Sequence, residues 1–243
     1  AVEDLVRALE LARETVKFNF ALLGEPSVEG ITSCVARLPV RERCPPPVAA
    51  ACVQYLDVMV RYGFVPPPVL GEVLVALCHT VSHPLLSDSS WHVARNLILS
   101  HTGRVAMETL CCLLDTVGGG AQHQAAPGPG AGEKGGDEAV AARRAATEAR
   151  VAVALARVAG TTVFGSVCRG AVYFVSMVTW GKHMVRAVHV TPFLVLPPLL
   201  RILGGAVDTV VALEVALSMR RLVKKFGEEL QVEWRLVFRI LRR

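Results

Sequence analysis

Apolar residues recur along most of this chain at helical spacing, and almost no segment alternates apolar and polar residues as a β-strand does. The apolar segments run for about 12 to 20 residues, a length typical of helices in globular proteins. Proline and glycine separate one segment from the next. The pattern predicts a protein that is nearly all helical.

The clearest predicted helix follows the sequence CPPP at residues 44–47. Proline suits a helix entrance because the first-turn N–H groups have no partner inside the helix to lose. Gly63 is expected to end this helix in the left-handed conformation. One face of the helix is polar, with Gln54, Asp57 and Arg61, and the other is an apolar stripe of Val48, Cys52, Leu56 and Met59.

The next two segments begin in a similar way. Prolines at 66–68 precede an apolar helix, and Asp88 and Ser89 are candidate N-cap residues of the helix after it. That later helix is expected to turn three residues inward: Trp91, Ala94 and Ile98.

Pairs of such helices recur at roughly 35 to 45 residues, the period of helical solenoids of the HEAT type. We therefore predict an all-α fold, a HEAT-like α-solenoid of about ten helices. A four-helix bundle with extra helices is the competing all-helical architecture.

A low-complexity stretch divides the chain. Residues 118–138 are rich in Gly, Ala and Pro and lack large apolar side chains, so they have little to bury against the entropy of ordering. We interpret them as a flexible insert between a first set of repeats at 1–117 and a second set at 139–243, together one continuous solenoid fragment.

Composition supports a folded chain, since 52% of the 243 residues are hydrophobic and only 19% are charged. The longest apolar run, 73–87, contains His79, His83 and Pro84 and is too short to span a membrane. No signal peptide is expected, because Glu3 and Asp4 interrupt the first segment. We expect a cytoplasmic protein. The chain opens on alanine, which is typical of a fragment.

The seven cysteines include no CxxC pair and lie mostly in apolar helical patterns. This arrangement predicts reduced, buried thiols rather than a disulfide framework. The net charge of +5 is modest for the length, so no nucleic-acid partner is expected.

The stretch SMRRLVKKFGEELQVEW at 218–234 concentrates basic side chains: Arg220, Arg221, Lys224 and Lys225. Five apolar residues at helical spacing, Val211, Val215, Met219, Leu222 and Phe226, place these bases on the remaining face and in the last turns. Positive charge there complements the helix dipole, and Gly227 followed by two glutamates suits a helix end and a new start. This structural role is the main interpretation of the cluster.

Two binding roles remain open for the same residues. A solenoid face carrying Arg220, Arg221, Lys224 and Lys225 could bind an acidic stretch of a protein partner. With Arg239, Arg242 and Arg243 it could instead dock on anionic lipid.

Few residues in the sequence are candidates for catalysis or for binding a metal or phosphate. Cys78, His79 and His83 lack a second ligand pair at zinc spacing, so we expect a buried helix end and no metal. The sequence TWGKH at 179–183 fails as a phosphate loop, because Ser176 replaces its first glycine and His183 its Ser or Thr. An unrecognised enzyme is the least favoured alternative, and no cofactor is expected. The aromatic residues Trp91, Trp180, Trp234 and Phe226 are interpreted as core.

The segment ALEVALSMRRLVKKFGEELQVEW at 212–234 strongly resembles the amino-terminal region of the tuberin family. Further blocks agree in order: VKFN at 16–19, LVALCHTV at 74–81, WHVARNLILSHTG at 91–103, RGAVYFVSMVTWGKHMV at 169–185 and LVLPPLLRIL at 194–203. The resemblance covers most of 16–243 and is absent across 117–160.

The resemblance implies a HEAT-like piece of a longer scaffold in the tuberous sclerosis complex. It implies binding to the coiled coil of hamartin, the partner subunit, and contact with the remainder of the tuberin chain. The family's domain that activates GTP hydrolysis by Rheb lies outside this fragment, so the fragment is expected to be non-catalytic and to act in restraint of target-of-rapamycin signalling. Placement at the cytosolic face of lysosomal or other endomembranes would come through the complex, without direct membrane contact. A HEAT-type scaffold of another large GTPase-activating protein is the alternative.

Overall fold

A computed structural model describes residues 2–118, 136–181, 192–204, 208–226 and 234–242. These residues form eleven α-helices and two short 3₁₀ helices, with no strand among them. The first helices are α1 (Val2–Asn19), α2 (Glu25–Arg37), α3 (Pro46–Tyr62), α4 (Leu70–Thr80) and α5 (Ser87–Leu99). The later ones are α6 (Gly103–Val117), α7 (Gly136–Ala156), α8 (Val163–Thr179), α9 (Pro192–Gly204), α10 (Thr209–Phe226) and α11 (Trp234–Leu241). The prediction of an all-α fold is confirmed.

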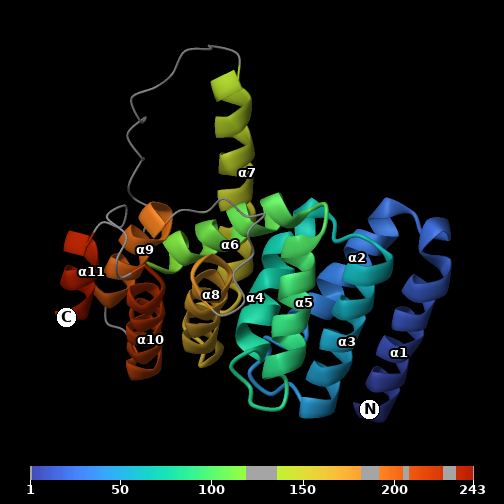
Figure 1. The fold of residues 1–243 in the computed structure, drawn as a ribbon. Coiled ribbons are helices and arrows are strands. Elements are labelled where there is room, and N and C mark those ends of the chain that lie inside the picture. The colour runs from blue at the N-terminus through green and yellow to red at the C-terminus, as the bar shows by residue number, and fades with distance from the viewer. Residues whose placement is uncertain (1, 119–135, 182–191, 205–207, 227–233, 243) are drawn as a thin grey trace.

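The helices stack in two rows rather than around one bundle axis (Figure 1). One row consists of α1, α3 and α5, and the other runs from α2 through α4 and α8 to α10. Arg13 on α1 contacts Gln54 on α3, and Phe20 lies beside Gly63, so these two helices run in the same direction. Helices of the same row thus repeat in one direction, as successive helix pairs of a HEAT-type solenoid do. The predicted architecture is confirmed.

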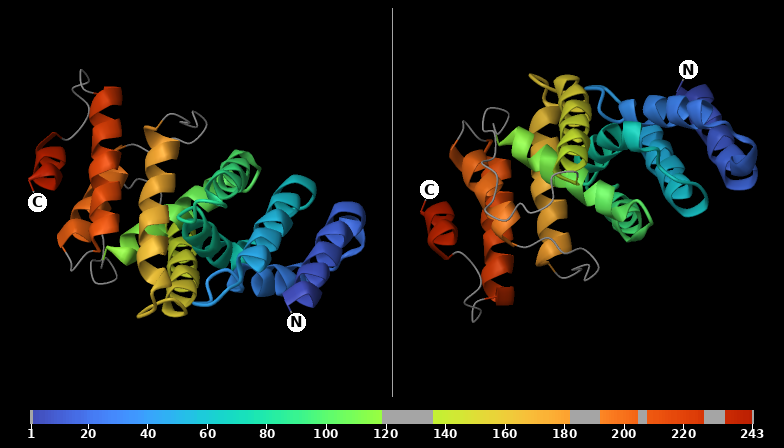
Figure 2. Two further views of the ribbon diagram at one scale, coloured as in Figure 1. Left: turned by 90° about the horizontal axis from the view of Figure 1, so that it is seen from below. Right: turned by 90° about the horizontal axis from the view of Figure 1, so that it is seen from above.

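Helix α4 lies at the centre of the array and contacts α2, α5, α6, α7 and α8. The crossing with α8 is very close, because a Cβ atom on Gly170 would overlap the carbonyl oxygen of Cys78. The Ala-rich helix α7 packs on α4 and α6, and α11 packs on α9 and α10 at the other end (Figure 2). The predicted insert at 118–138 lies almost entirely outside the described residues.

Helix α3 matches its prediction along its length. Its apolar stripe is buried, and Gln54 and Arg61 are exposed on the other face. The expected left-handed conformation at Gly63 is wrong, since its φ is −127°. Glycine is needed there for space, because a Cβ atom would lie 2.6 Å from the ring of Phe20.

The expected caps of α5 are also wrong. The helix begins at Ser87 after Leu86, so Asp88 and Ser89 lie in its first turn and no side chain caps it. Asp88 still places negative charge where the helix dipole favours it. Ala94 and Ile98 are buried as expected, and Trp91 is half-buried. Prolines 66–68 precede α4 through a short 3₁₀ helix at Pro67–Val69.

Candidate binding surface

Helix α10 carries the basic cluster and packs along α8. Its predicted apolar stripe is buried at Val211, Val215, Met219 and Leu222, while Phe226 is half-buried at the end of the helix. The two lysines of the cluster lie in the last turn, where positive charge complements the carbonyl end of the dipole. Gly227 and the two glutamates after it lie outside the described residues.

The contact between α8 and α10 is fixed at one end by Trp180. This side chain is 1% exposed, and its Nε1–H donates a hydrogen bond of 3.0 Å to the carbonyl oxygen of Ser218. A buried indole usually finds such a partner, because an unpaired N–H in the interior is costly. The bond therefore fixes how α10 is placed against the end of α8.

A buried carboxylate lies further along the same contact. Glu214 is only 3% exposed, and its Oε1 is 2.8 Å from Nη1 of Arg221. Its Oε2 is 3.6 Å from Nε of Arg169 on α8. A buried charge is tolerated when it is paired in this way, so the two arginines stabilise the ionised glutamate between the helices.

Arg221 has further partners on α8. Its Nη1 donates a hydrogen bond of 3.1 Å to Oγ of Ser176, and its guanidinium lies 5.7 Å from the ring centroid of Tyr173. Burial raises the pKa of the Tyr173 hydroxyl, and the nearby Arg221 opposes that rise. Arg221 is thus held by an internal network of Glu214, Ser176 and Tyr173.

The structure divides the predicted basic cluster. Arg220, Lys224 and Lys225 are exposed on the outer face of α10, whereas Arg221 turns toward α8. We call the three exposed residues the basic trio. The four bases look alike in the local sequence, so it did not indicate that Arg221 turns inward. One signal was present: Glu214, three residues after Val211, places a charge on the apolar face of the helix.

The four aromatic residues predicted as core lie in different settings. Trp180 is fully buried, and Trp91, Trp234 and Phe226 are half-buried against the core. Trp91 lies at a centroid distance of 6.0 Å from both Tyr173 and Phe174, in a cluster that joins α5 to α8.

A second, half-buried acid could not be recognised from the sequence. Glu72 on α4 accepts hydrogen bonds from Ser33 at 2.6 Å and from Arg37 at 2.9 Å, both on α2. Nε of Arg157, just after α7, lies 3.6 Å from the same carboxylate. Its hydrogen bond with Glu72 raises the pKa of the Arg37 guanidinium. This network ties α2, α4 and the end of α7 together.

The residues weighed for metal or phosphate chemistry lie at a helix junction. His79 is hydrogen-bonded to Ser166 of α8, and Cys78 is buried. Within the ranges that the structure describes, no three His, Cys, Asp or Glu side chains are arranged to hold a metal ion. None of the helices in these ranges is long and apolar enough to cross a membrane. His183 lies outside the described residues.

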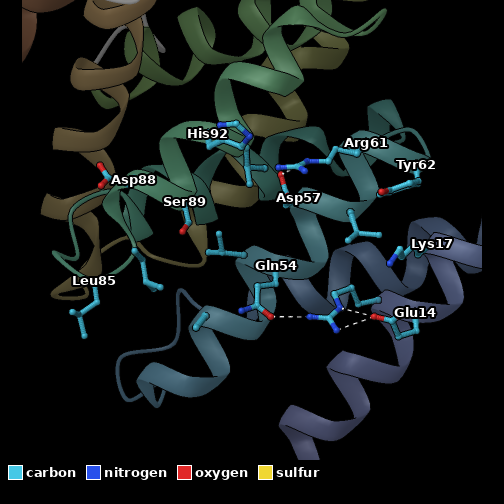
Figure 3. Close-up of a pocket in the computed structure, with 16 residues that line it drawn as sticks. Glu14, Lys17, Gln54, Asp57, Arg61, Tyr62, Leu85, Asp88, Ser89 and His92 are labelled. Carbon is cyan, nitrogen blue, oxygen red and sulfur yellow. Dashed lines mark hydrogen bonds and ion pairs between the residues drawn. The ribbon is translucent and has the colours of Figure 1, made fainter.

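A broad open groove lies over α3, between α1 and α5 (Figure 3). Its volume is about 780 Å³. Its floor includes Val53, Val58 and Val93, and charged residues of α1, α3 and α5 form its walls. No local sequence pattern indicates this groove, because its walls come from three separate helices.

A family model described as Domain of unknown function (DUF3384) matches residues 1–243. The chain belongs to this family. A solved structure of the TSC2 N-terminus matches 99% of the chain with a TM-score of 0.52 and 17% sequence identity. This chain spans 63% of the matched one. The DUF3384 chain therefore has the helical fold of that amino-terminal region, and the resemblance to tuberin is confirmed at the level of the fold. The likeness is to an amino-terminal helical region, not to a catalytic domain.

Proposed function

We propose that this chain is a non-catalytic scaffold module that binds the hamartin coiled coil. In this role it contributes to a tuberous sclerosis complex that activates GTP hydrolysis by Rheb and restrains target-of-rapamycin signalling. The observation that supports the proposal is a solenoid with the fold of the TSC2 N-terminus that presents the basic trio, Arg220, Lys224 and Lys225, exposed and without an ion pair to the described residues.

The charge of the basic trio suits a coiled-coil partner. Coiled coils expose charged residues beside their apolar seam, and an acidic stretch of such a helix would match the three exposed bases in the last turns of α10. Each rim contact is worth only about 0.2 to 1 kcal/mol, so apolar contacts elsewhere must supply most of the affinity. The bases would mainly set register and speed association.

The proposal includes the organisation of the chain and its place in the cell. The repeats at 1–117 and 139–243 act as one scaffold around a flexible insert at 118–138, and the remainder of a longer tuberin-like chain continues the array. The module works on the cytosolic side of endomembranes through the complex.

The test is a binding assay between this chain and hamartin coiled-coil fragments. Changing Arg220, Lys224 and Lys225 together to Glu is expected to weaken binding about tenfold, the sum of three rim contacts. The salt dependence of binding should fall as well, because fewer ion pairs remain to be screened.

The matched control reverses three other exposed bases, Arg41, Arg43 and Arg95, and should change the affinity less than about twofold. Circular dichroism and the thermal midpoint of both triple variants should stay near wild type. Equal binding by the trio variant and the control would show that the trio is structural only.

Direct docking on anionic lipid is the second candidate. It is favoured by exposed Arg239 and Arg242 on and just after α11 beside Phe238, which is 57% exposed, because bases flanking an exposed aromatic residue suit a membrane surface. Co-sedimentation of the chain with phosphatidylserine vesicles, lost on changing both arginines to Glu, would support this candidate over a purely protein-binding role.

A further inference from the structure

The groove over α3 crosses three helices of one row. Arg13, Glu14 and Lys17 come from α1, Asp88, Ser89 and His92 come from α5, and α3 supplies the floor between them. A site for a small molecule typically buries most of its ligand, whereas this groove is open to solvent along its length (Figure 3). Its shape therefore fits an elongated occupant better than a compact one.

Most charges in the groove are already paired across or along its walls. Arg13 donates hydrogen bonds to Glu14 at 2.8 Å and to Gln54 at 3.0 Å. Arg61 is 3.0 Å from Asp57, one turn away on α3. These pairs neutralise one another, so they add little net charge to the surface.

Two charges remain without an ion pair to any described residue, and they lie at opposite ends of the groove. Asp88 and Leu85 lie at the same end of the groove, and Lys17 and Tyr62 lie at the other end (Figure 3). Leu85 is 81% exposed and Tyr62 is 53% exposed. The ammonium of Lys17 lies 4.8 Å from the ring centroid of Phe18. Each end of the groove thus combines one charge that has no ion pair to a described residue with one exposed large apolar side chain.

We propose that this groove binds a single amphipathic helix of a partner protein. The helix packs apolar residues against Leu85 at one end and Tyr62 at the other, and its polar residues lie over the paired charges of α3. A basic residue faces Asp88 and an acidic residue faces Lys17. Helices pack readily into such grooves through residues three and four apart, and the two end charges select the register. The inference rests on the proposed function in one respect, that the helix belongs to the hamartin coiled coil.

The first test uses Leu85→Glu and measures the affinity for hamartin coiled-coil fragments by fluorescence anisotropy. Leu22→Glu is the matched control, since Leu22 is 83% exposed but does not line the groove. We expect Leu85→Glu to weaken binding at least tenfold and Leu22→Glu to change it less than twofold. Both variants should keep the wild-type thermal midpoint, because neither side chain is buried.

The second test locates the helix directly. Cys34 is exposed and is first changed to Ser, and a photo-crosslinker is then attached through Ser89→Cys in the groove or through Leu22→Cys outside it. We expect cross-linking to a hamartin fragment only from position 89, at a segment that carries a basic residue. Asp88→Lys should weaken binding, and restoring it should require an acidic residue at that position of the fragment.

The outcomes separate this inference from the proposed function. If the wild-type chain binds hamartin fragments while Leu85→Glu binds equally well and position 89 gives no cross-link, the groove is not the site and the proposed function stands. If no hamartin fragment binds the wild-type chain, the proposed function fails and the assignment of the groove fails with it.

Discussion

Arg221 and Glu214 lie two turns apart on α10, and Nη1 of the arginine is 2.8 Å from Oε1 of the glutamate. The pair faces α8, where Arg169 and Ser176 complete the network. A residue that looks like part of a basic surface in the sequence is therefore one of the contacts that hold two helices together.

Removing the carboxylate of this network should destabilise the fold. Glu214→Ala leaves Arg221 and Arg169 without their common partner, and we expect a loss of about 2 to 3 kcal/mol in the free energy of unfolding. Urea denaturation followed by circular dichroism measures the change. Glu148→Ala is the control, since it breaks only an exposed pair with Arg144, and it should cost less than about 0.5 kcal/mol. Similar losses for the two variants would contradict the buried network.

Gly170 should tolerate no side chain. Gly170→Ala places a Cβ atom against the backbone of Cys78, so α4 and α8 must move apart, at a cost of about 3 kcal/mol. Gly30→Ala is the matched control on α2, where a Cβ atom meets nothing within 4 Å. It should stabilise the protein by about 0.5 to 1 kcal/mol, because alanine is the better helix former. Thermal or urea unfolding of the two variants should therefore shift in opposite directions.

Stability should fall as the pH drops below neutral because of His79. Burial, and to a smaller degree the nearby His83, lower the pKa of His79 below its usual 6.5. The folded state then binds fewer protons than the unfolded state, so the contribution is complete above the unfolded pKa and is lost as the pH falls through 6.5 toward the folded value.

The measurement is the thermal midpoint between pH 7.5 and pH 5.5 for the wild type and for His79→Asn. The Oγ of Ser166 donates to the carbonyl of Val163, so it accepts a hydrogen bond from Nδ1–H of His79. The amide group of asparagine can donate in its place without titrating. The wild-type midpoint should fall more steeply than that of the variant, and parallel curves would remove His79 as the cause.

Thiol reactivity should separate one cysteine from the others. Cys34 is exposed, whereas burial raises the pKa of the Cys52, Cys111 and Cys168 thiols to about 12. The thiolate is the reactive form, so at pH 8 a single thiol should react quickly with a chromogenic disulfide reagent in the folded protein. Cys34→Ser should abolish that fast phase and Cys111→Ala should leave it intact. A fast phase that survives Cys34→Ser would show that another thiol is accessible.

The helical class and the buried face of α10 could be predicted from sequence, because the spacing of Val211, Val215, Met219 and Leu222 depends only on local geometry. The same reasoning placed Gly63 at the end of α3. The predicted reason, a left-handed conformation, is wrong. The glycine leaves space for the ring of Phe20, which belongs to another helix. Local patterns report periodicity well and report neighbours across the fold poorly.

Buried Glu214 and half-buried Glu72 illustrate that limit. Glu72 is paired with Arg37 and lies near Arg157, and Glu214 is paired with Arg221 and lies near Arg169. In the sequence each is one acid among many, and only the folded arrangement brings its bases to it. The groove over α3 was unpredictable for the same reason, since α1, α3 and α5 form it jointly.

The close crossing of α4 and α8 also affects how the chain folds. Cys78 and Gly170 touch backbone to backbone, yet α5, α6, α7 and the Gly-, Ala- and Pro-rich segment lie between them in the sequence. The entropy of closing such a loop grows only with the logarithm of its length, about 0.6 kcal/mol for each doubling. Lengthening or shortening that segment should therefore change the folding rate only slightly, and evolution is free to vary its length without disturbing the junction.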